Sequence, residues 1–132
     1  MQKFSMKTFL LSFVIAVSLV AYAKGAKSYE ATVDRVVDGD TLVCMLDLGE
    51  DVFKKTYVRF HKASAPETST EAGLLAKKNL SDLLPRGTPL RLEVRGKSHG
   101  RLVCVVWAGN VNINDQAIRL GICRVTSSKE RF

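Results

Sequence analysis

Beyond residue 28, the pattern of apolar and polar positions predicts mostly short β-strands. Residues 29–37 alternate loosely between apolar and polar side chains and are rich in β-branched types, as in a strand. Residues 41–48 and 52–60 follow as two more strands, with "DGD" and "GED" breaking the pattern between them. Because "GED" is a turn signal of the hairpin kind, the three strands are predicted to form an antiparallel meander.

The spacing then becomes helical over "STEAGLLAKKNLSDLL", residues 69–84. Ser69 or Thr70 can cap the start of this helix, and Pro85 with Gly87 ends it. Its apolar positions are leucines 74, 75, 80, 83 and 84.

The remaining elements are two strands, a short helix closed by Gly121 and a last short strand, at residues 89–94, 101–108, 113–121 and 122–126. Residues 95–100, "RGKSHG", are predicted to be a loop. A meander, a helix and then strands with a short helix between them predict a mainly β fold with helices (α+β), a five-stranded OB-fold Greek-key barrel. An SH3-like barrel is the next alternative, but it rarely carries a helix of this length.

The N-terminal residues have the pattern of a secretory signal. Lys3 and Lys7 precede an apolar run at residues 9–20, and "AYA" at 21–23 matches a small-x-small cleavage pattern. The prediction is a signal peptide over residues 1–23, a linker over 24–28, one domain over 29–126 and a tail over 127–132. Export to the periplasm or the medium follows, with an uncleaved N-terminal anchor as the alternative.

The charge balance adds a preference for an anionic partner. The chain has 20 basic and 13 acidic residues, a net charge of +7. Two lysines and no acid fall within residues 1–23, so the rest carries 18 basic and 13 acidic residues, a net of +5. This excess favours a polyanion such as nucleic acid or an anionic surface. The remaining 109 residues suffice for one small domain, expected to be a monomer.

Three cysteines, Cys44, Cys104 and Cys123, each lie in an apolar stretch and are interpreted as small buried core residues. Export would permit a disulfide, and Cys104 and Cys123 lie on late strands that neighbour each other in an OB barrel. The chain has no C-x-x-C and no clustered histidines, so a zinc site has little support.

The candidate chemistry begins in "DGDT", residues 38–41, which places two carboxylates around a glycine at a turn. Asp40 and the backbone carbonyl of Thr41 could face one hard cation, which takes oxygen ligands. Taken alone, this stretch is more often an ordinary hairpin turn.

Three further charged residues, together with "DGDT", supply the kinds of group found in a hydrolytic site. Arg59 ends one strand, Glu67 follows the break at Pro66, and Arg101 opens the apolar strand 101–108. Guanidinium groups donate paired hydrogen bonds to phosphate, and a carboxylate can take a proton from water. A metal, two arginines and a carboxylate are the groups needed to hydrolyse a phosphodiester.

The order and spacing of "VVDGDTL", "VRFHKASAPE", "EAGLLAKKNLSDLL" and "HGRLVCVVWAGNVNINDQAIRLGICRV" resemble the thermonuclease (staphylococcal or micrococcal nuclease-like) family over about residues 28–126. The resemblance implies an OB-fold barrel that cleaves DNA and RNA with Ca²⁺, or with another divalent ion. It implies catalytic roles for Arg59, Glu67 and Arg101. It also implies metal ligation by Asp40 and by the carbonyl of Thr41.

The chain departs from the family pattern in three places. Ser64 stands in "SAPE" where the family has a second metal-ligating Asp, and it would be a much poorer ligand for Ca²⁺. Lys97 and His99 lie where the family has an Asp and a Tyr, and remain candidates for contacts with substrate. The loop between Glu67 and the helix is shorter, and the family's C-terminal helix has no counterpart before the final "SSKERF".

These features predict an exported metal-dependent nuclease acting on DNA or RNA. The main alternative is a thermonuclease-like OB module that binds nucleic acid or protein without cleaving, since a fold does not fix a function. A third reading is a stress or envelope protein with no nucleic-acid role.

Overall fold

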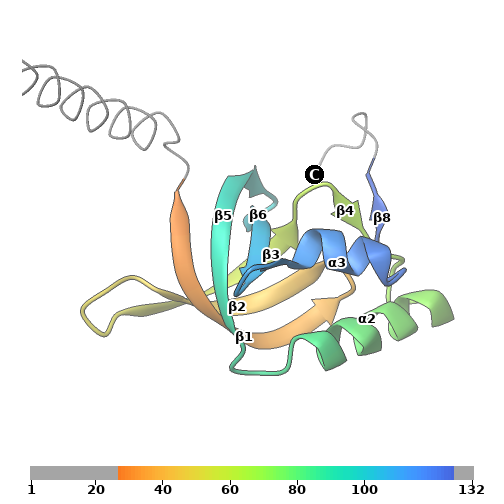
Figure 1. Cartoon of the computed structure of the whole chain (residues 1–132), viewed down its shortest axis with the longest axis horizontal. Helices are drawn as coiled ribbons and strands as arrows, with labels where there is room; N and C mark the ends of the chain where they lie inside the picture. The colour runs from red at the N-terminus through yellow and green to blue at the C-terminus, as the bar shows by residue number, and fades with distance from the viewer. Residues whose placement is uncertain (1–26, 127–132) are drawn as a thin grey trace, which may run out of the picture.

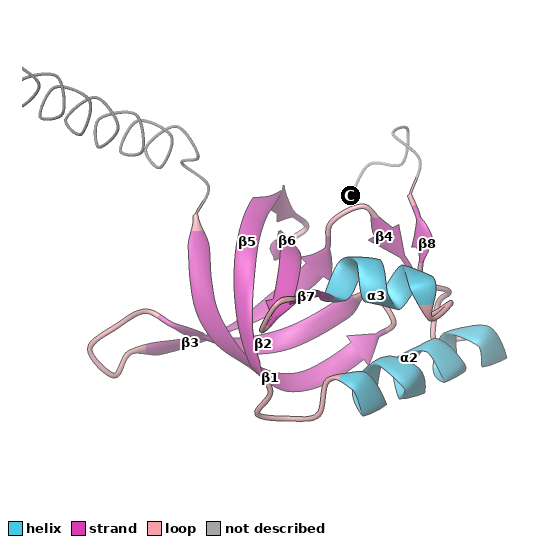
Figure 2. Cartoon of the chain, in the orientation of Figure 1, coloured by secondary structure: helices cyan, strands magenta, loops and turns pink. Residues whose placement is uncertain are grey.

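The computed structural model describes residues 27–126, and the predicted signal peptide and C-terminal tail lie outside these residues. Five strands form the body of the molecule: β1 (Ser28–Asp38), β2 (Thr41–Asp47), β3 (Phe53–Phe60), β5 (Pro89–Ser98) and β6 (Arg101–Ala108). Two helices, α2 (Glu71–Leu83) and α3 (Ile113–Arg119), and three two-residue strands, β4 (Ala63–Ser64), β7 (Val111–Asn112) and β8 (Arg124–Val125), complete it (Figure 2).

The five strands close into a barrel. The neighbours run antiparallel in the order β3-β2-β1-β5-β6, and a parallel pairing of β3 with β6 joins the two ends. This connectivity confirms the predicted mainly β, OB-like Greek-key barrel with two helices. Closure leaves none of these five strands as a free edge.

The core fills the inside of the barrel with side chains from alternate strand positions. Val58 and Phe60 of β3 are fully buried, as is Leu92 of β5. Such alternation is what one buried face of a strand requires. The register of this face also decides which charged side chains point outward, so it fixes the candidate site.

Helix α2 begins where the sequence predicts it and packs beside β1 (Figure 1). The Thr70 hydroxyl caps it by accepting a hydrogen bond from the Gly73 backbone N–H at 3.0 Å. Its buried face consists of Gly73, Ala76 and Leu80, whereas Leu74 and Leu75 are exposed. The leucines alone therefore did not identify the buried face, because small residues bring the helix close to the barrel.

Strand β5 is longer than predicted. An irregularity between Val94 and Gly96 lets the strand continue to Ser98, so most of the predicted loop 95–100 is strand. Only His99 and Gly100 turn the chain into β6. Both have positive φ (52° and 76°), as a two-residue hairpin turn of type I′ requires.

Helix α3 confirms the predicted short helix near the C-terminus. Asn112 caps its start, and Gly121 with φ of 75° follows its end. The last strand is shorter than predicted, because Ile122 and Cys123 are buried in the core and only Arg124–Val125 pairs with β4. Within residues 27–126, the two helices are too short or too polar to cross a membrane.

All three cysteines are buried and free, which confirms their interpretation as core residues. Burial raises the pKa of each thiol to about 12, so each is a neutral S–H at physiological pH. Cys104 and Cys123, for which the sequence left a bridge open, form no disulfide with each other; the Cys123 thiol donates a hydrogen bond to the carbonyl oxygen of Gly39 at 3.0 Å.

Candidate active site

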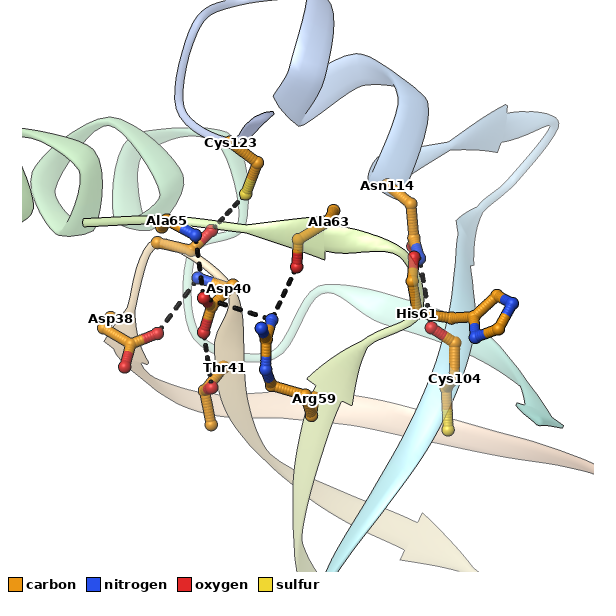
Figure 3. A network of polar contacts seen from close by, with 11 residues as sticks. Asp38, Asp40, Thr41, Arg59, His61, Ala63, Ala65, Cys104, Asn114 and Cys123 are labelled. Carbon is orange, nitrogen blue, oxygen red and sulfur yellow. Dashed lines mark hydrogen bonds and ion pairs between the residues drawn. The ribbon is translucent and has the colours of Figure 1, made fainter. Parts of the chain in front are cut away.

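An ion pair between Asp40 and Arg59 lies at the centre of the candidate site (Figure 3). Strand β2 follows the DGDT turn and pairs with β3, so Thr41 lies opposite Arg59. Arg59 Nη1 is 3.1 Å from Asp40 Oδ2, and the two side chains are only 12% and 10% exposed. The two residues that the sequence separates by nineteen positions therefore meet in a mostly buried contact.

Two further donors hold the Asp40 carboxylate. The Thr41 hydroxyl donates to Asp40 Oδ1 at 2.8 Å, and the Ala65 backbone N–H donates to Oδ2 at 2.8 Å. Arg59 Nη1 also donates to the Ala63 carbonyl oxygen at 2.6 Å. The backbone of residues 63–65 is thus tied to both members of the ion pair, which fixes the start of the segment that carries Glu67.

Gly39 allows this close approach. A Cβ at Gly39 would lie 2.6 Å from the Cβ of Ala65 and 2.9 Å from the Cβ of Ala76, closer than real side chains come. The DGDT turn, the SAPE segment and helix α2 therefore pack against one another around this glycine. The glycine in "DGD" is a packing requirement as well as a turn residue.

Asp38 is the second carboxylate of the DGDT turn, and the structure brings it next to Asp40. Its Oδ1 accepts a hydrogen bond from the Asp40 backbone N–H at 3.0 Å. The pKa of Asp38 is raised to about 6, chiefly by burial and next by a side-chain hydrogen bond with Asp40. Negative charge is thus concentrated at this turn beyond what Arg59 neutralises.

This raised pKa predicts a pH-dependent effect of Asp38→Asn. The folded protein holds the Asp38 proton more tightly than the unfolded chain, whose pKa is near 3.8, so stability falls as pH rises from about 4 to about 6. Asparagine imitates the protonated carboxyl. In chelator at pH 7.5, we expect Asp38→Asn to raise the free energy of unfolding by about 1–2 kcal/mol, discounted because the group is half exposed.

Urea unfolding at pH 7.5 and at pH 3.5 measures this effect. At pH 3.5 the wild type and the variant should have nearly the same stability, because Asp38 is then protonated in both the folded and the unfolded wild type. Asp82→Asn, which changes an exposed carboxylate on α2, is the control and should show no such dependence. Equal effects of Asp38→Asn at both pH values would contradict the prediction.

Glu67 lies just beyond this cluster, exposed at the turn between β4 and α2. Within residues 27–126 the structure records no hydrogen bond or ion pair of its carboxylate, which is open to water. Its backbone is fixed: the Glu67 carbonyl oxygen accepts from the Thr70 N–H at 3.0 Å and the Thr70 hydroxyl at 2.7 Å. Gly73 is required here, because a Cβ at Gly73 would overlap the Glu67 carbonyl group. The short loop therefore places Glu67 firmly.

Arg101 shares a face of the barrel with Arg59 without contacting the Asp40–Arg59 pair. Arg59 lies beside Val103 in the parallel pairing, and Arg101 is two residues before Val103, so both arginines lie on the same side of the sheet. Arg101 is partly buried, and its Nε donates to the Ser98 carbonyl oxygen at 3.4 Å. Lys97 and His99 are exposed on either side of Ser98, near the β5–β6 turn.

The two other predicted metal ligands are Ser64, on β4, and Thr41, at the start of β2. Ser64 belongs to β4 and pairs with Arg124 of β8, one residue before the Ala65 that contacts Asp40. Thr41 presents its hydroxyl to Asp40 and is buried. Among residues 27–126, no group of three or more His, Cys, Asp or Glu side chains is arranged to hold a metal.

The carboxylates of Asp38 and Asp40 nonetheless fit a hard divalent cation. They are oxygen donors, and the two residues lie side by side, since Asp38 Oδ1 accepts a hydrogen bond from the Asp40 backbone N–H at 3.0 Å. Two carboxylates suit an ion that completes its coordination with water and substrate phosphate. The sequence pattern does not identify Asp38 as a ligand. The signal that could have found it is its position two residues before Asp40, with Gly39 between them.

Comparison with known proteins identifies a similar protein. The chain is 33% identical over 114 residues to a protein of Haemophilus influenzae named "Uncharacterized endonuclease". The match covers 86% of this chain and 61% of that protein, so the chain spans about three fifths of its length. No family model matches the chain. The likeness supports a nuclease-like relationship, and assignment to the thermonuclease family stays a prediction.

Proposed function

We propose that this protein is a metal-dependent nuclease that hydrolyses phosphodiester bonds of DNA or RNA. The observation that carries the proposal is the contact network in which Asp40, Arg59 and the backbone of the SAPE segment meet, with Glu67 two residues beyond Ala65. These groups come from two parts of the sequence, residues 38–41 and 59–67. A domain that needed only its fold would have no reason to place a buried ion pair beside an exposed, firmly held carboxylate.

In this proposal each side chain has a distinct role. Glu67 accepts a proton from the water that attacks phosphorus, for which its exposure to solvent suits it. Arg59 and Arg101 donate hydrogen bonds to the phosphate oxygens, whose negative charge grows as the water oxygen bonds to phosphorus and one P–O ester bond breaks. Arg59 uses Nη1 for Asp40 and Ala63, and its Nε and Nη2 carry its other N–H groups.

Asp38 and Asp40 would hold the divalent ion, with Ca²⁺ as the first candidate. The Ser64 hydroxyl and the Thr41 carbonyl are weaker additional donors. A bound divalent ion supplies charge neutralisation for the phosphate and lowers the pKa of coordinated water. Binding would also favour the ionised form of Asp38, so the ion is expected to bind more weakly below pH 6.

A second candidate function is a module that binds nucleic acid without cleaving it. Two observations favour it: Ser64 replaces a carboxylate, and both oxygens of Asp40 already accept hydrogen bonds. In that case the Asp40–Arg59 pair would be structural, and the basic surface alone would be functional.

Plasmid nicking separates the two functions. The full chain is incubated with supercoiled plasmid and with single-stranded RNA in Ca²⁺, Mg²⁺ or Mn²⁺, and in parallel with EDTA. We expect cleavage that requires a divalent ion and stops in EDTA. A thermal melt with and without Ca²⁺ tests ion binding independently of activity. Retained binding with no cleavage under any ion would exclude the nuclease and favour the binding module.

A further inference from the structure

The Cys123 side chain is buried against the DGDT turn, although it lies more than eighty residues later in the chain. It is 6% exposed, and its thiol donates a hydrogen bond to the Gly39 carbonyl oxygen at 3.0 Å. The backbone N–H groups of Ile122 and Cys123 both donate to the Ala117 carbonyl oxygen, at 2.9 Å and 3.1 Å. The end of helix α3 therefore holds the thiol in place against the turn.

The Gly39 carbonyl group depends on this thiol. Gly39 is buried, and the thiol is the one hydrogen-bond donor to its carbonyl oxygen that the structure records within residues 27–126. A buried carbonyl that loses its donor costs free energy, even though a thiol is a weak donor. Burial raises the pKa of the Cys123 thiol to about 12, so the donated proton is present at neutral pH.

The same peptide group also supports the Asp38 carboxylate. The Gly39 carbonyl and the Asp40 N–H belong to one planar peptide and point in opposite directions. The Asp40 N–H donates to Asp38 Oδ1 at 3.0 Å, and Figure 3 draws this bond as a dashed line, as it does the bond from Cys123. The thiol therefore holds one end of a peptide whose other end holds the carboxylate.

This peptide is also the one most free to rotate. Gly39 and Asp40 are the two residues between the end of β1 and the start of β2. Rotation of the peptide between the two central residues is what separates a type I from a type II turn. Gly39 has no side chain to oppose that rotation, which would direct the Asp40 N–H away from Asp38.

We propose that Cys123 is a positioning residue, whose thiol holds the Gly39–Asp40 peptide in the orientation that keeps the Asp38 carboxylate beside Asp40. The inference rests on the proposed function, in which these two carboxylates bind a divalent ion. Cys123 contacts neither the ion nor the substrate and acts through the peptide. Removing a group that orients metal ligands in this way typically weakens metal binding by about 10–100-fold.

Thermal unfolding of the full chain tests the proposal without an activity assay. Melting temperatures are recorded with a reductant over a series of Ca²⁺, Mg²⁺ or Mn²⁺ concentrations, which gives the ion affinity. We expect Cys123→Ala to bind the ion about tenfold more weakly than wild type. Cys123→Ser keeps a hydrogen-bond donor and should bind nearly as tightly as wild type. The lower melting temperature without ion, which any truncation of a buried side chain causes, is recorded separately.

Cys104→Ala is the matched control. It makes the same change at a second buried cysteine, whose thiol has no hydrogen bond recorded within residues 27–126. Its ion affinity should equal that of wild type. Equal weakening by Cys104→Ala and Cys123→Ala would indicate a loosened core and overturn the proposal. Unchanged ion binding in Cys123→Ala, or equal weakening by the alanine and serine variants, would overturn it as well.

A measurement in EDTA separates this proposal from the proposed function. Urea midpoints are recorded for Cys123→Ala in the wild type and in the Asp38→Ala background. We expect a smaller shift in the second background, because the peptide then has no carboxylate to support. Cys104→Ala should give the same shift in both.

Equal shifts of Cys123→Ala in the two backgrounds would overturn the positioning role, whether or not an ion binds. If no ion stabilised wild type but the shifts differed as expected, the metal site would be wrong and the positioning of Asp38 would stand.

Discussion

Replacing Arg59 with glutamine is expected to lower the free energy of unfolding by about 3–5 kcal/mol. The variant leaves the Asp40 carboxylate mostly buried without its cation, since only about a tenth of that side chain is exposed. It also removes the hydrogen bond to the Ala63 carbonyl oxygen. Equilibrium urea unfolding measures the loss, which is a large part of the total stability of a domain of this size.

A second variant shows whether the stability lost in Arg59→Gln comes from the unpaired, buried Asp40 carboxylate or from lost packing. Asp40→Asn/Arg59→Gln removes both charges and should recover part of the stability lost by Arg59→Gln alone. Arg95→Gln is the matched surface control, because Arg95 pairs with Glu93 at 3.2 Å while 45% exposed, and it should change stability by less than about 1 kcal/mol. Equal losses in Arg59→Gln and Arg95→Gln would mean that the buried pair has no special role.

Replacing Glu67 with glutamine is expected to reduce metal-dependent cleavage by about 10²–10⁴-fold while leaving the fold intact. Glutamine keeps the size of the side chain but cannot take a proton from water. The structure gives two reasons to expect an unchanged melt: Glu67 is exposed, and the hydrogen bonds recorded at this residue use its backbone carbonyl. Initial nicking rates and thermal unfolding are recorded on the same samples.

Glu71→Gln provides the control, because it makes the same chemical change four residues later in the first turn of α2. It should cleave at the wild-type rate. If Glu67→Gln retained full activity while EDTA still stopped cleavage, another group would be the base, and the assignment of Glu67 would be wrong. If both glutamine variants lost activity equally, net charge rather than position would be responsible.

Much of the fold follows from local patterns in the sequence. Strands β1 to β3, helix α2 and helix α3 were predicted within a few residues, because strand alternation, Thr70 as a cap and Gly121 at a helix end are local signals. The errors have tertiary causes. The continuation of β5 through a bulge depends on its pairing with β6, and the exposure of Leu74 and Leu75 depends on which face of α2 meets the barrel.

The candidate site divides in the same way. The sequence by itself determined the residue types and their order: a "DGDT" turn, an arginine at a strand end, a glutamate after a proline and a second arginine before an apolar strand. It also determined the basic charge that favours a polyanionic partner, because composition requires no fold.

Only the tertiary structure decided which of these groups touch. Closure of the barrel by β3 and β6 puts both arginines on one side, and Gly39 and Gly73 let the segments around Asp40 and Glu67 pack without side chains between them. The raised pKa of Asp38 arises from its burial and from its contact with Asp40 in the folded turn. Such properties depend on distances across the fold, which a linear pattern of residues does not contain.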